Sequence, residues 1–535
     1  MSNFNEEAHL LENVSILDCT LRDGGYCNQW LFGKNNIIKI INGLIEAGIN
    51  IIECGFFTNK VQYNTEVAKY TTLEQIGELL PENRTNKLFV CLINYGEYEA
   101  DKIPQYDGTS LDGFRIAFHK KDMAPALEFC KEIKEKGYKV FIQPMVSLNY
   151  SDEEFLELIR IVNGFEPYAF YIVDSFGVMK RKDLIRLFYM VEHNLKDNIA
   201  IGYHSHNNMQ LAYSNAQALV DIRTKRKMII DSSIFGMGRG AGNLNTELFV
   251  EYLNDNINMK YILKPLLTII DEILNPFYQK NYWGYSLPNY LAAKYNAHPN
   301  YAVYLDAKKT LTVENMDDIF SMMDEEKRSV YDRNYIEKLY IQYMDTGNVQ
   351  EAHLSELKEI IKGKEVLIIA PGRSAVVERE KVLTCAGRKN IVTIGINFDY
   401  TEFNTHFIFL SNLRRFRELP EEKRKKCIVT SNIPVSDAYI QTNYHDLLNQ
   451  EDAVQDNAGM MLIKYLIQLG AVKIFIAGLD GYSVDAIGNY ADPQMSFFSG
   501  KERFMAMNQG MIHVLKEFKK QIEIEFVTTP KFVLI

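Results

Sequence analysis

The chain has 535 residues, of which 47% are hydrophobic and 24% charged, and its formal net charge is −10. At about 150 residues per domain, this length predicts roughly two to four domains. The acidic balance argues against a nucleic-acid or anionic-membrane partner, and seven cysteines are too few for a disulfide framework. No apolar run approaches the ~18 residues of a membrane span, and the polar, acidic start of the chain is unlike a signal peptide. We therefore expect a soluble, cytoplasmic enzyme.

The first 310 residues repeat one pattern, a short apolar strand followed by an amphipathic segment. Eight strands are expected, at Val14–Cys19, Ile49–Phe56, Leu88–Asn94, Gly113–Phe118, Tyr138–Met145, Tyr168–Asp174, Ile199–His206 and Met228–Phe235. Helix-period segments such as Asn35–Ala47 and Arg181–Asn194 separate most of them. Near-continuous apolar strands joined by helices indicate a buried parallel sheet. Eight such units predict a (β/α)8 TIM barrel over 1–310, with its active site at the C-terminal strand ends.

A second α/β series begins at residue 363. The segment 311–362 is charged and helical in period, and we expect a helical connector there. Six further strands are expected, at Glu365–Ala370, Ile391–Asn397, His406–Ser411, Cys427–Thr430, Val472–Ala477 and Ile524–Thr528. This series predicts a smaller α/β domain over 363–535, doubly wound and Rossmann-like.

Three motifs fall where a barrel places its chemistry. Leu17–Gly25 (LDCTLRDGG) follows the first strand, His204-Ser-His206 ends the seventh, and Gly236–Asn243 (GMGRGAGN) follows the eighth. Residues i and i+2 of a strand face the same way, so both imidazoles point into one site. Taken singly, these motifs are a salt bridge, a polar strand face and a turn. Because they converge on one rim, a carboxylate and two imidazoles predict a divalent-metal site with positions open for substrate.

In combination, the motifs LRDG, HSHNN and GRGAGN resemble those of the DRE-TIM metallolyase superfamily, which includes 4-hydroxy-2-oxovalerate aldolase and hydroxymethylglutaryl-CoA lyase. The resemblance covers about residues 14–305, and Val173–Gly177 (VDSFG) looks most like the aldolase branch. It implies that Arg22 stabilises an enolate oxygen. It also implies a divalent metal, manganese or magnesium with zinc as an alternative, held by Asp23, His204, His206 and, as in some members, Asn243.

The general base is the point at which this chain departs from the aldolase pattern. Those aldolases have a histidine three residues after the metal-binding aspartate, where this chain has Tyr26. A free tyrosine has a pKa of about 10 and is a weak base at pH 7. Glu53, at the end of the second strand, faces the same rim, although an ion pair with Arg22 is an equally good interpretation. The departure at Tyr26 favours a substrate other than hydroxyoxovalerate.

Further candidates follow the barrel. Tyr285 and Tyr290 lie in the segment WGYSLPNY and are candidates to close over the site, with packing as their structural interpretation. Lys294, Tyr295 and His298 form a polar cluster that we interpret as a capped helix end. The identity of the base and the direction of the reaction therefore stay open.

The second domain starts with Ile368–Ser374 (IIAPGRS), a strand and a glycine turn whose backbone N–H groups suit a phosphate. Together with Gly395–Asn397 and the helix, strand and acidic turn of 458–482, it resembles sialyltransferase-like Rossmann domains of bacterial surface-polysaccharide enzymes. This resemblance covers about residues 363–530 and sets His513 against the transferase base. It implies a nucleotide or nucleotide-sugar near Gly372, Ser374, Asn397 and Asp480. The basic run 414–426 is interpreted as a solvated face.

These observations lead to one leading hypothesis and two alternatives. We expect the chain to be a metal-dependent aldolase or lyase that makes or breaks a C–C bond between a pyruvate-like 2-oxo acid and an aldehyde. A role in surface-carbohydrate biosynthesis is part of this expectation. We also expect a homo-oligomer. An acyl-CoA-dependent Claisen-type synthase would instead release a thiol. A catalytically inactive nucleotide-sugar-binding protein would release neither a thiol nor pyruvate.

Overall fold

The computed structural model describes residues 13–532, apart from 83, 85, 223, 258, 309–310, 345–350, 434–436, 484–488 and 493–500, and apart from the side chains of 351–353 and 401. The chain divides into two compact units. Unit 1 takes the described residues up to Val303 together with Asp324–Tyr331, and unit 2 takes Tyr304–Met323 and the described residues from Asp332 onward. The segment expected to be a connector is thus shared between the units. The polar start of the chain, residues 1–12, lies outside the described residues.

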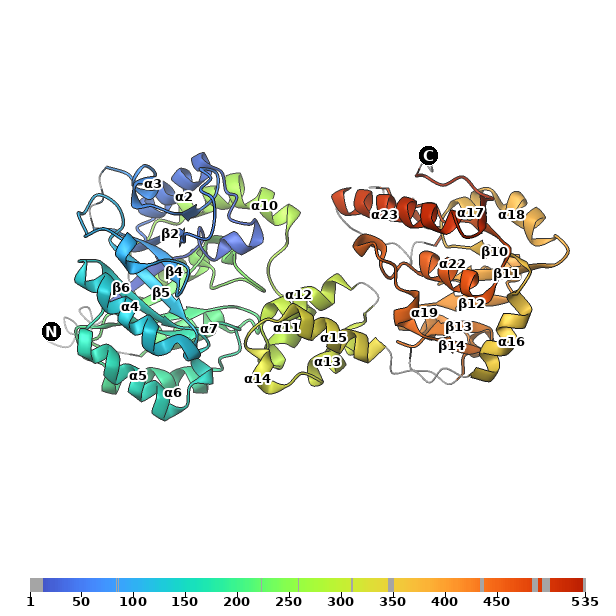
Figure 1. The fold of residues 1–535 in the computed structure, drawn as a ribbon. Helices are drawn as coiled ribbons and strands as arrows, with labels where there is room; N and C mark the ends of the chain where they lie inside the picture. Colours follow the sequence, from blue (N-terminus) through green and yellow to red (C-terminus); the bar gives the residue numbers. More distant parts are fainter. Residues whose placement is uncertain are drawn as a thin grey trace. The chain divides into compact units, whose positions relative to one another are not determined.

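Unit 1 contains the predicted barrel of eight parallel strands (Figure 1). Its strands are β1 (Val14–Asp18), β2 (Ile51–Phe57), β4 (Leu88–Asn94), β5 (Gly113–Phe118), β6 (Lys139–Pro144), β7 (Ala169–Asp174), β8 (Ala200–Ser205) and β9 (Met228–Ser232). The barrel closes because β1 pairs in parallel with both β9 and β2. A two-residue strand, β3 (Lys69–Tyr70), extends the sheet beside β2 and is too short to be recognised from the sequence.

Helices cover the outside of the barrel and follow its strands in sequence. They are α2 (Lys34–Glu46), α3 (Leu73–Gly77), α4 (Met123–Glu135), α5 (Asp152–Phe165), α6 (Arg181–Asn194), α7 (Ala212–Val220) and α8 (Thr246–Ile257). Apolar residues at helical spacing, such as Ile37, Ile40, Ile41 and Leu44 of α2, are buried against the strands. The capping box of Ser151 and Glu154 fixes where α5 begins.

Side chains along each strand point alternately to the two faces of the sheet, and this alternation separates two cores. Ile52 of β2 and Ile142 of β6 pack outward with the helices, while Val90, Phe141 and Ile229 fill the inside of the barrel. Because the inside is packed, polar groups are accessible only where the strands end. The parallel register sets Val173 of β7 beside His204 of β8, so the neighbouring loops leave the sheet at the same rim.

Short helices follow the barrel. They are α9 (Leu263–Ile269), a π-helical turn (Ile270–Leu274), α10 (Asn275–Lys280), α11 (Leu287–Lys294), α12 (Pro299–Ala307), α13 (Val313–Ser321), α14 (Glu325–Arg328), α15 (Arg333–Met344) and α16 (Glu351–Ile361). Two hydrogen bonds join α15 to the rest of unit 2. Tyr340 shares a 2.9 Å hydroxyl contact with Tyr444, and the Ser431 hydroxyl donates to the Met344 carbonyl at 2.6 Å.

Unit 2 is built on a seven-stranded parallel sheet with the order β14-β13-β12-β11-β10-β15-β16. Its strands are β10 (Glu365–Ile369), β11 (Ile391–Ile396), β12 (Phe407–Leu410), β13 (Cys427–Thr430), β14 (Ile440–Thr442), β15 (Lys473–Ala477) and β16 (Glu523–Phe526). Six of them match the expected strands, whereas β14, with three residues, was not predicted. The strand order reverses between β10 and β15.

The helices of unit 2 connect these strands, and their lengths vary widely. They are α17 (Ser374–Val377), α18 (Arg379–Ala386), α19 (Leu413–Glu418), α20 (Glu421–Arg424), α21 (Tyr444–Leu447), α22 (Ala458–Leu469) and α23 (Lys501–Lys519). The most buried is α22, which begins at the Asn457 cap and ends at Gly470 in the left-handed conformation. Across the described ranges of both units, no helix combines the length and apolar character needed to cross a membrane.

Candidate metal centre and active site

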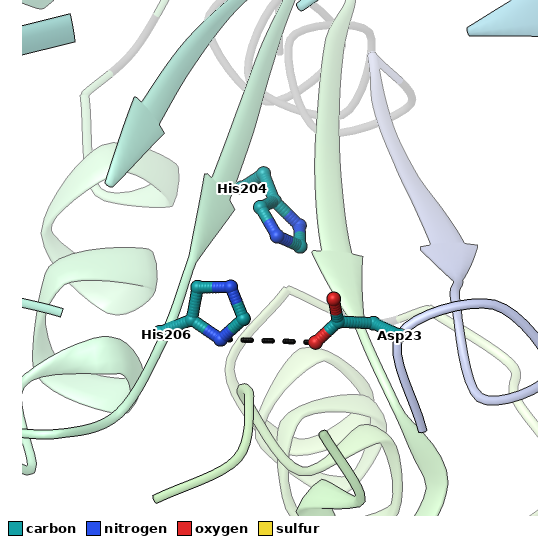
Figure 2. A group of neighbouring side chains, drawn as sticks. All are labelled: Asp23, His204 and His206. Carbon is teal, nitrogen blue, oxygen red and sulfur yellow. Dashed lines mark ion pairs between the residues drawn. The ribbon is translucent and has the colours of Figure 1, made fainter. Parts of the chain in front are cut away.

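The three expected metal ligands meet at the barrel rim (Figure 2). Asp23 sits just before the 3-10 turn Gly24–Cys27 that follows β1, His204 lies in β8, and His206 comes directly after it. One ligand atom from each residue lies within 4.8 Å of the others, and all three residues are buried. A single small cation placed among these atoms would be within reach of all three.

The electrostatics of the cluster favour a cation. Burial lowers the pKa of His206 to about 3, so its ring is neutral at pH 7 and keeps a lone pair. Burial alone would raise the pKa of the Asp23 carboxyl, but the Arg22 guanidinium outweighs it and holds this pKa well below its usual range. The Nδ1 atom of His206 lies 3.7 Å from Asp23 Oδ2 and has no hydrogen-bond partner among the described residues. A carboxylate facing an unsatisfied imidazole nitrogen fits a divalent metal.

Asn243 contacts the same cluster of ligand candidates. Its Nδ2 donates to Asp23 Oδ2 at 2.7 Å, whereas its Oδ1 is buried without a partner in the described part of the chain. Gly238 leaves the space for this contact, because a Cβ there would stand 2.2 Å from Asn243 Nδ2 and 2.8 Å from Asp23 Oδ2. The glycine-rich loop after β9 therefore shapes the floor of the cluster.

A chain of buried ion pairs runs beneath the cluster. Arg22 binds Asp23 Oδ1 through Nη1 at 2.5 Å and Glu53 Oε2 through Nε at 2.9 Å. Glu53 Oε2 also binds Arg115 at 2.7 Å, and Arg115 in turn binds Asp231. Every member is held by an opposite charge, as buried ionic groups require. Glu53 is thus committed to two guanidinium groups, which agrees with its ion-pair interpretation and disfavours it as a general base.

The ion-pair chain ends on a metal-ligand candidate. Asp231 Oδ2 lies 2.9 Å from His204 Nδ1. Burial would raise the pKa of Asp231, but Arg115 and His204 lower it overall, so the carboxylate stays ionised. The ionised carboxylate accepts a hydrogen bond from the Nδ1–H of His204 and leaves Nε2 as the ligand atom, an arrangement common around metal-bound histidines. Arg115 and Asp231 were not among the residues predicted for the site, although a charged residue within each of the apolar strands GFRIAF and MIIDS is a signal that the sequence offers.

A cavity of about 260 Å³ opens beside the cluster at the same rim. Tyr26, Arg239 and His298 line it, together with residues that follow β4, β5, β6 and β7. Arg239 joins the cavity to the cluster, because its backbone N–H donates to Asp23 Oδ2 at 3.4 Å and its guanidinium carbon lies 5.3 Å from the centre of the Tyr26 ring. The three ligand candidates are not among the described lining residues, so Arg239 is the link between the cavity and the cluster.

The candidates for the general base differ in whether they line this cavity. Tyr26 lines the cavity, whereas Tyr285 is 56% exposed and neither Tyr285 nor Tyr290 is among the described residues around it. His298, interpreted from the sequence as part of a helix end, lies on the cavity wall. Burial, with a smaller contribution from Arg239, lowers the pKa of His298 to about 3 and keeps its imidazole neutral. The sequence offered no motif that connects this residue to the barrel rim.

In unit 2, three of the four expected ligand-binding residues line a second cavity of about 630 Å³: Gly372, Asn397 and Asp480. The fourth, Ser374, hydrogen-bonds Asp480 through its backbone N–H at 2.8 Å and through its hydroxyl. The basic run also reaches this cavity through Arg414 and Arg415. His513 lies on α23, is not among the described lining residues, and pairs with Glu451.

Comparison with known proteins bears on unit 1. Residues 13–269 match the HMGL-like family. A 4-hydroxy-2-oxovalerate aldolase from Geobacillus genomosp. 3 is 28% identical over 271 residues, which cover 49% of this chain and 78% of the relative. The 4-hydroxy-2-oxovalerate aldolase of Pseudoalteromonas translucida is 24% identical over 269 residues, covering 50% of this chain and 77% of the relative.

Solved structures also match this half of the chain. The N-terminal domain of a Bacteroides vulgatus protein assigned as an aldolase is 28% identical, with 55% of this chain and 96% of that chain covered and a TM-score of 0.48. The HMG-CoA lyase of Bacillus subtilis is 15% identical, covers 50% of this chain and 93% of its own, and has a TM-score of 0.39. Residues 13–269 thus match the HMGL-like family model, and 4-hydroxy-2-oxovalerate aldolases are among the relatives of this half of the chain.

Proposed function

We propose that unit 1 is a divalent-metal-dependent aldolase or lyase that cleaves or forms a C–C bond between a pyruvate-like 2-oxo acid and an aldehyde. The observation that carries this proposal is the meeting of Asp23, His204 and His206 within 4.8 Å beside a 260 Å³ cavity. Relatives named 4-hydroxy-2-oxovalerate aldolase support the same class of reaction.

The three ligand candidates, with Asn243 Oδ1 as a fourth, would hold manganese, magnesium or zinc. When bound, such an ion supplies Lewis-acid polarisation of a 2-oxo group. Arg22 supplies a fixed positive charge beside the place where the enolate oxygen develops, and its ion pairs with Asp23 and Glu53 keep it oriented. The Arg239 guanidinium on the cavity wall adds a second positive charge that suits the substrate carboxylate.

The bond changes define what the remaining residues must do. In the cleavage direction, the 4-hydroxyl proton passes to a base, the C3–C4 bond breaks, and its electron pair stays on C3 as the enolate while the aldehyde leaves. A proton added to C3 then gives the 2-oxo acid. Tyr26 and His298 both line the cavity and are the two candidates for exchanging the hydroxyl proton. A pKa of about 3 makes the His298 imidazole a weak base, its Nδ1 already accepts a hydrogen bond from the Asn300 N–H at 3.2 Å, and an ordinary phenol is protonated at pH 7, so neither candidate is favoured by its protonation state alone.

A coupled assay of pyruvate release from a series of 4-hydroxy-2-oxo acids tests the proposal. We expect release that depends on added Mn²⁺ or Mg²⁺ and is lost in Asp23→Asn. His298→Asn and Tyr26→Phe then separate the two base candidates, because only the variant that removes the base lowers kcat while the ion still binds. Release of a thiol from acyl-CoA substrates would favour the Claisen-type synthase, and no turnover with any substrate would favour the inactive binding protein.

A further inference from the structure

Arg239 places a half-buried positive charge on the wall of the barrel cavity. Among the described residues its guanidinium forms no ion pair with a carboxylate, and its Nε atom is buried without a hydrogen-bond partner. Its Nη2 atom donates a long hydrogen bond, of 3.5 Å, to the Ser175 backbone carbonyl. Arg22 and Arg115, at the same rim, are each bound to two carboxylates. Because buried ionic groups are normally paired, the unpaired guanidinium indicates a ligand that supplies the negative charge.

The Ser175 hydroxyl offers a second donor beside this guanidinium. Ser175 follows β7, is buried and lines the same cavity. Its Oγ accepts a hydrogen bond from the Val146 N–H at 2.9 Å, and its own proton has no acceptor in the described part of the chain. Val146 holds its N–H there with a φ of +53°, a left-handed conformation that β-branched residues rarely adopt and that clusters at functional sites. The hydroxyl proton is therefore left for a ligand in the cavity.

The Arg239 side chain leads from the ligand cluster to the cavity wall. Its backbone N–H donates to Asp23 Oδ2 at 3.4 Å, and three methylene groups carry its guanidinium from there to the Ser175 carbonyl. Arg22 binds Asp23 directly and lies where the enolate half of a substrate is expected. The guanidinium of Arg239 therefore faces the other half of the substrate, beyond the C–C bond that breaks. In a 4-hydroxy-2-oxo acid, that half becomes the aldehyde.

The rest of the lining favours a short substrate with a singly charged group. Two carboxylates, Glu97 and Asp122, also line the cavity, and within the described ranges neither forms an ion pair with Arg239. Glu97 Oε1 accepts a hydrogen bond from Asn94 Nδ2 at 3.0 Å. The charges of these two residues disfavour a phosphate dianion, and a volume of about 260 Å³ suits a small ligand. A carboxylate meets both limits, because its two oxygens match the fork of a guanidinium.

We propose that Arg239, together with the Ser175 hydroxyl, makes unit 1 specific for an aldehyde that carries a carboxylate. The proposal rests on the aldolase or lyase function proposed above and adds the class of the acceptor. In the cleavage direction, the substrate is then a 4-hydroxy-2-oxo diacid. Its hydroxyl proton passes to the base, the C3–C4 bond breaks with the electron pair left on C3, and the aldehyde leaves with its carboxylate unchanged.

Condensation assays of the full chain with Mn²⁺ and pyruvate test the proposal, with the consumption of pyruvate as the readout. The acceptors are 4-oxobutanoate, which carries a carboxylate, pentanal, a neutral aldehyde of similar length, and glyceraldehyde 3-phosphate. We expect kcat/KM for 4-oxobutanoate to exceed that for pentanal about tenfold or more, since hydrogen bonds to a charged group are the stronger ones.

The outcomes distinguish this proposal from the function on which it rests. Equal or higher kcat/KM for pentanal would overturn the acidic acceptor and leave the aldolase in place. A higher value for glyceraldehyde 3-phosphate than for 4-oxobutanoate would overturn the choice of a carboxylate. No consumption of pyruvate with any aldehyde would overturn the aldolase itself, and the acidic acceptor with it.

Variants of Arg239 locate the effect. Arg239→Gln should raise the KM for 4-oxobutanoate about tenfold or more, and by a larger factor than the KM for pyruvate, because it removes the charge and keeps the backbone N–H that contacts Asp23. Arg239→Lys retains the charge without the planar fork and should recover part of this loss. Arg181→Gln is the matched control, since Arg181 is exposed at the start of α6 and absent from the described cavity lining. An equal rise of both KM values in Arg239→Gln would assign the guanidinium to the 2-oxo acid and show that the proposal is wrong.

Discussion

The cavity at the barrel rim and the cavity of unit 2 use charge in different ways. At the barrel rim the charged groups are buried and bound to one another, and the Arg115 and Glu53 side chains are both 0% exposed. Around the cavity of unit 2, cations come from short helices at the surface, and the Arg414 side chain is 74% exposed. A buried, cross-linked ionic network keeps its groups fixed for chemistry, whereas exposed arginines suit the capture of an anionic ligand. The buried network therefore fits the chemistry proposed for unit 1.

The largest loss of activity is expected when a metal-ligand candidate of unit 1 is removed. His204→Ala deletes one of three metal-ligand candidates, so we expect pyruvate release to fall by more than about 100-fold, beyond the usual effect of losing a supporting group. His193→Ala is the control, because His193 is an exposed histidine of α6. Equal activity in the two variants would remove His204 from the site.

A smaller effect is expected from the group that positions His204. Asp231→Asn weakens the charge that orients His204 and leaves Arg115 with one carboxylate, and we expect Mn²⁺ affinity to fall about 10–100-fold. If Asp231 acts through the metal, excess Mn²⁺ should restore kcat, which a purely structural defect would not allow. Asp101→Asn, at an exposed position of the same unit, is expected to have the Mn²⁺ affinity and kcat of the unchanged chain. Failure of Mn²⁺ to rescue Asp231→Asn would exclude the positioning role.

The smallest effect concerns the glycine-rich loop. Gly238→Ala places a methyl group against Asn243 and Asp23, and crowding of this kind lowers stability by about 1–3 kcal/mol. We also expect weaker Mn²⁺ binding, measured alongside thermal unfolding. Gly164→Ala in α5, where a Cβ meets nothing within 4 Å, should be neutral or stabilising by up to about 1 kcal/mol. Identical Mn²⁺ affinity in both variants would show that Gly238 does not shape the site.

Sequence patterns predicted most of the barrel because its signals are local. Apolar runs of five to seven residues specify its eight strands, and the i, i+2 rule brings His204 and His206 together within β8 and the residue after it. The three-residue β14 contains too short a pattern to be recognised, so the sheet of unit 2 has one strand more than expected.

Groups that meet through the tertiary fold were not predictable. Arg115 and Asp231 are 116 positions apart, and only the barrel places them in contact. His298 reaches the cavity through helices that follow the barrel, a path that no sequence period reveals. The Gly372 turn has the sequence of a phosphate loop, but its amides bind Gly478 and the distant Asp480, which the sequence could not show.

The most direct test of the central claim is equilibrium binding of Mn²⁺ to the full chain and to His206→Ala. If Asp23, His204 and His206 hold one ion together, the unchanged chain binds one Mn²⁺ at this site, and His206→Ala loses that binding while its thermal unfolding in the absence of metal stays close to that of the unchanged chain. Equal Mn²⁺ binding by the two proteins, or none by the unchanged chain under conditions where it is folded, would contradict the account.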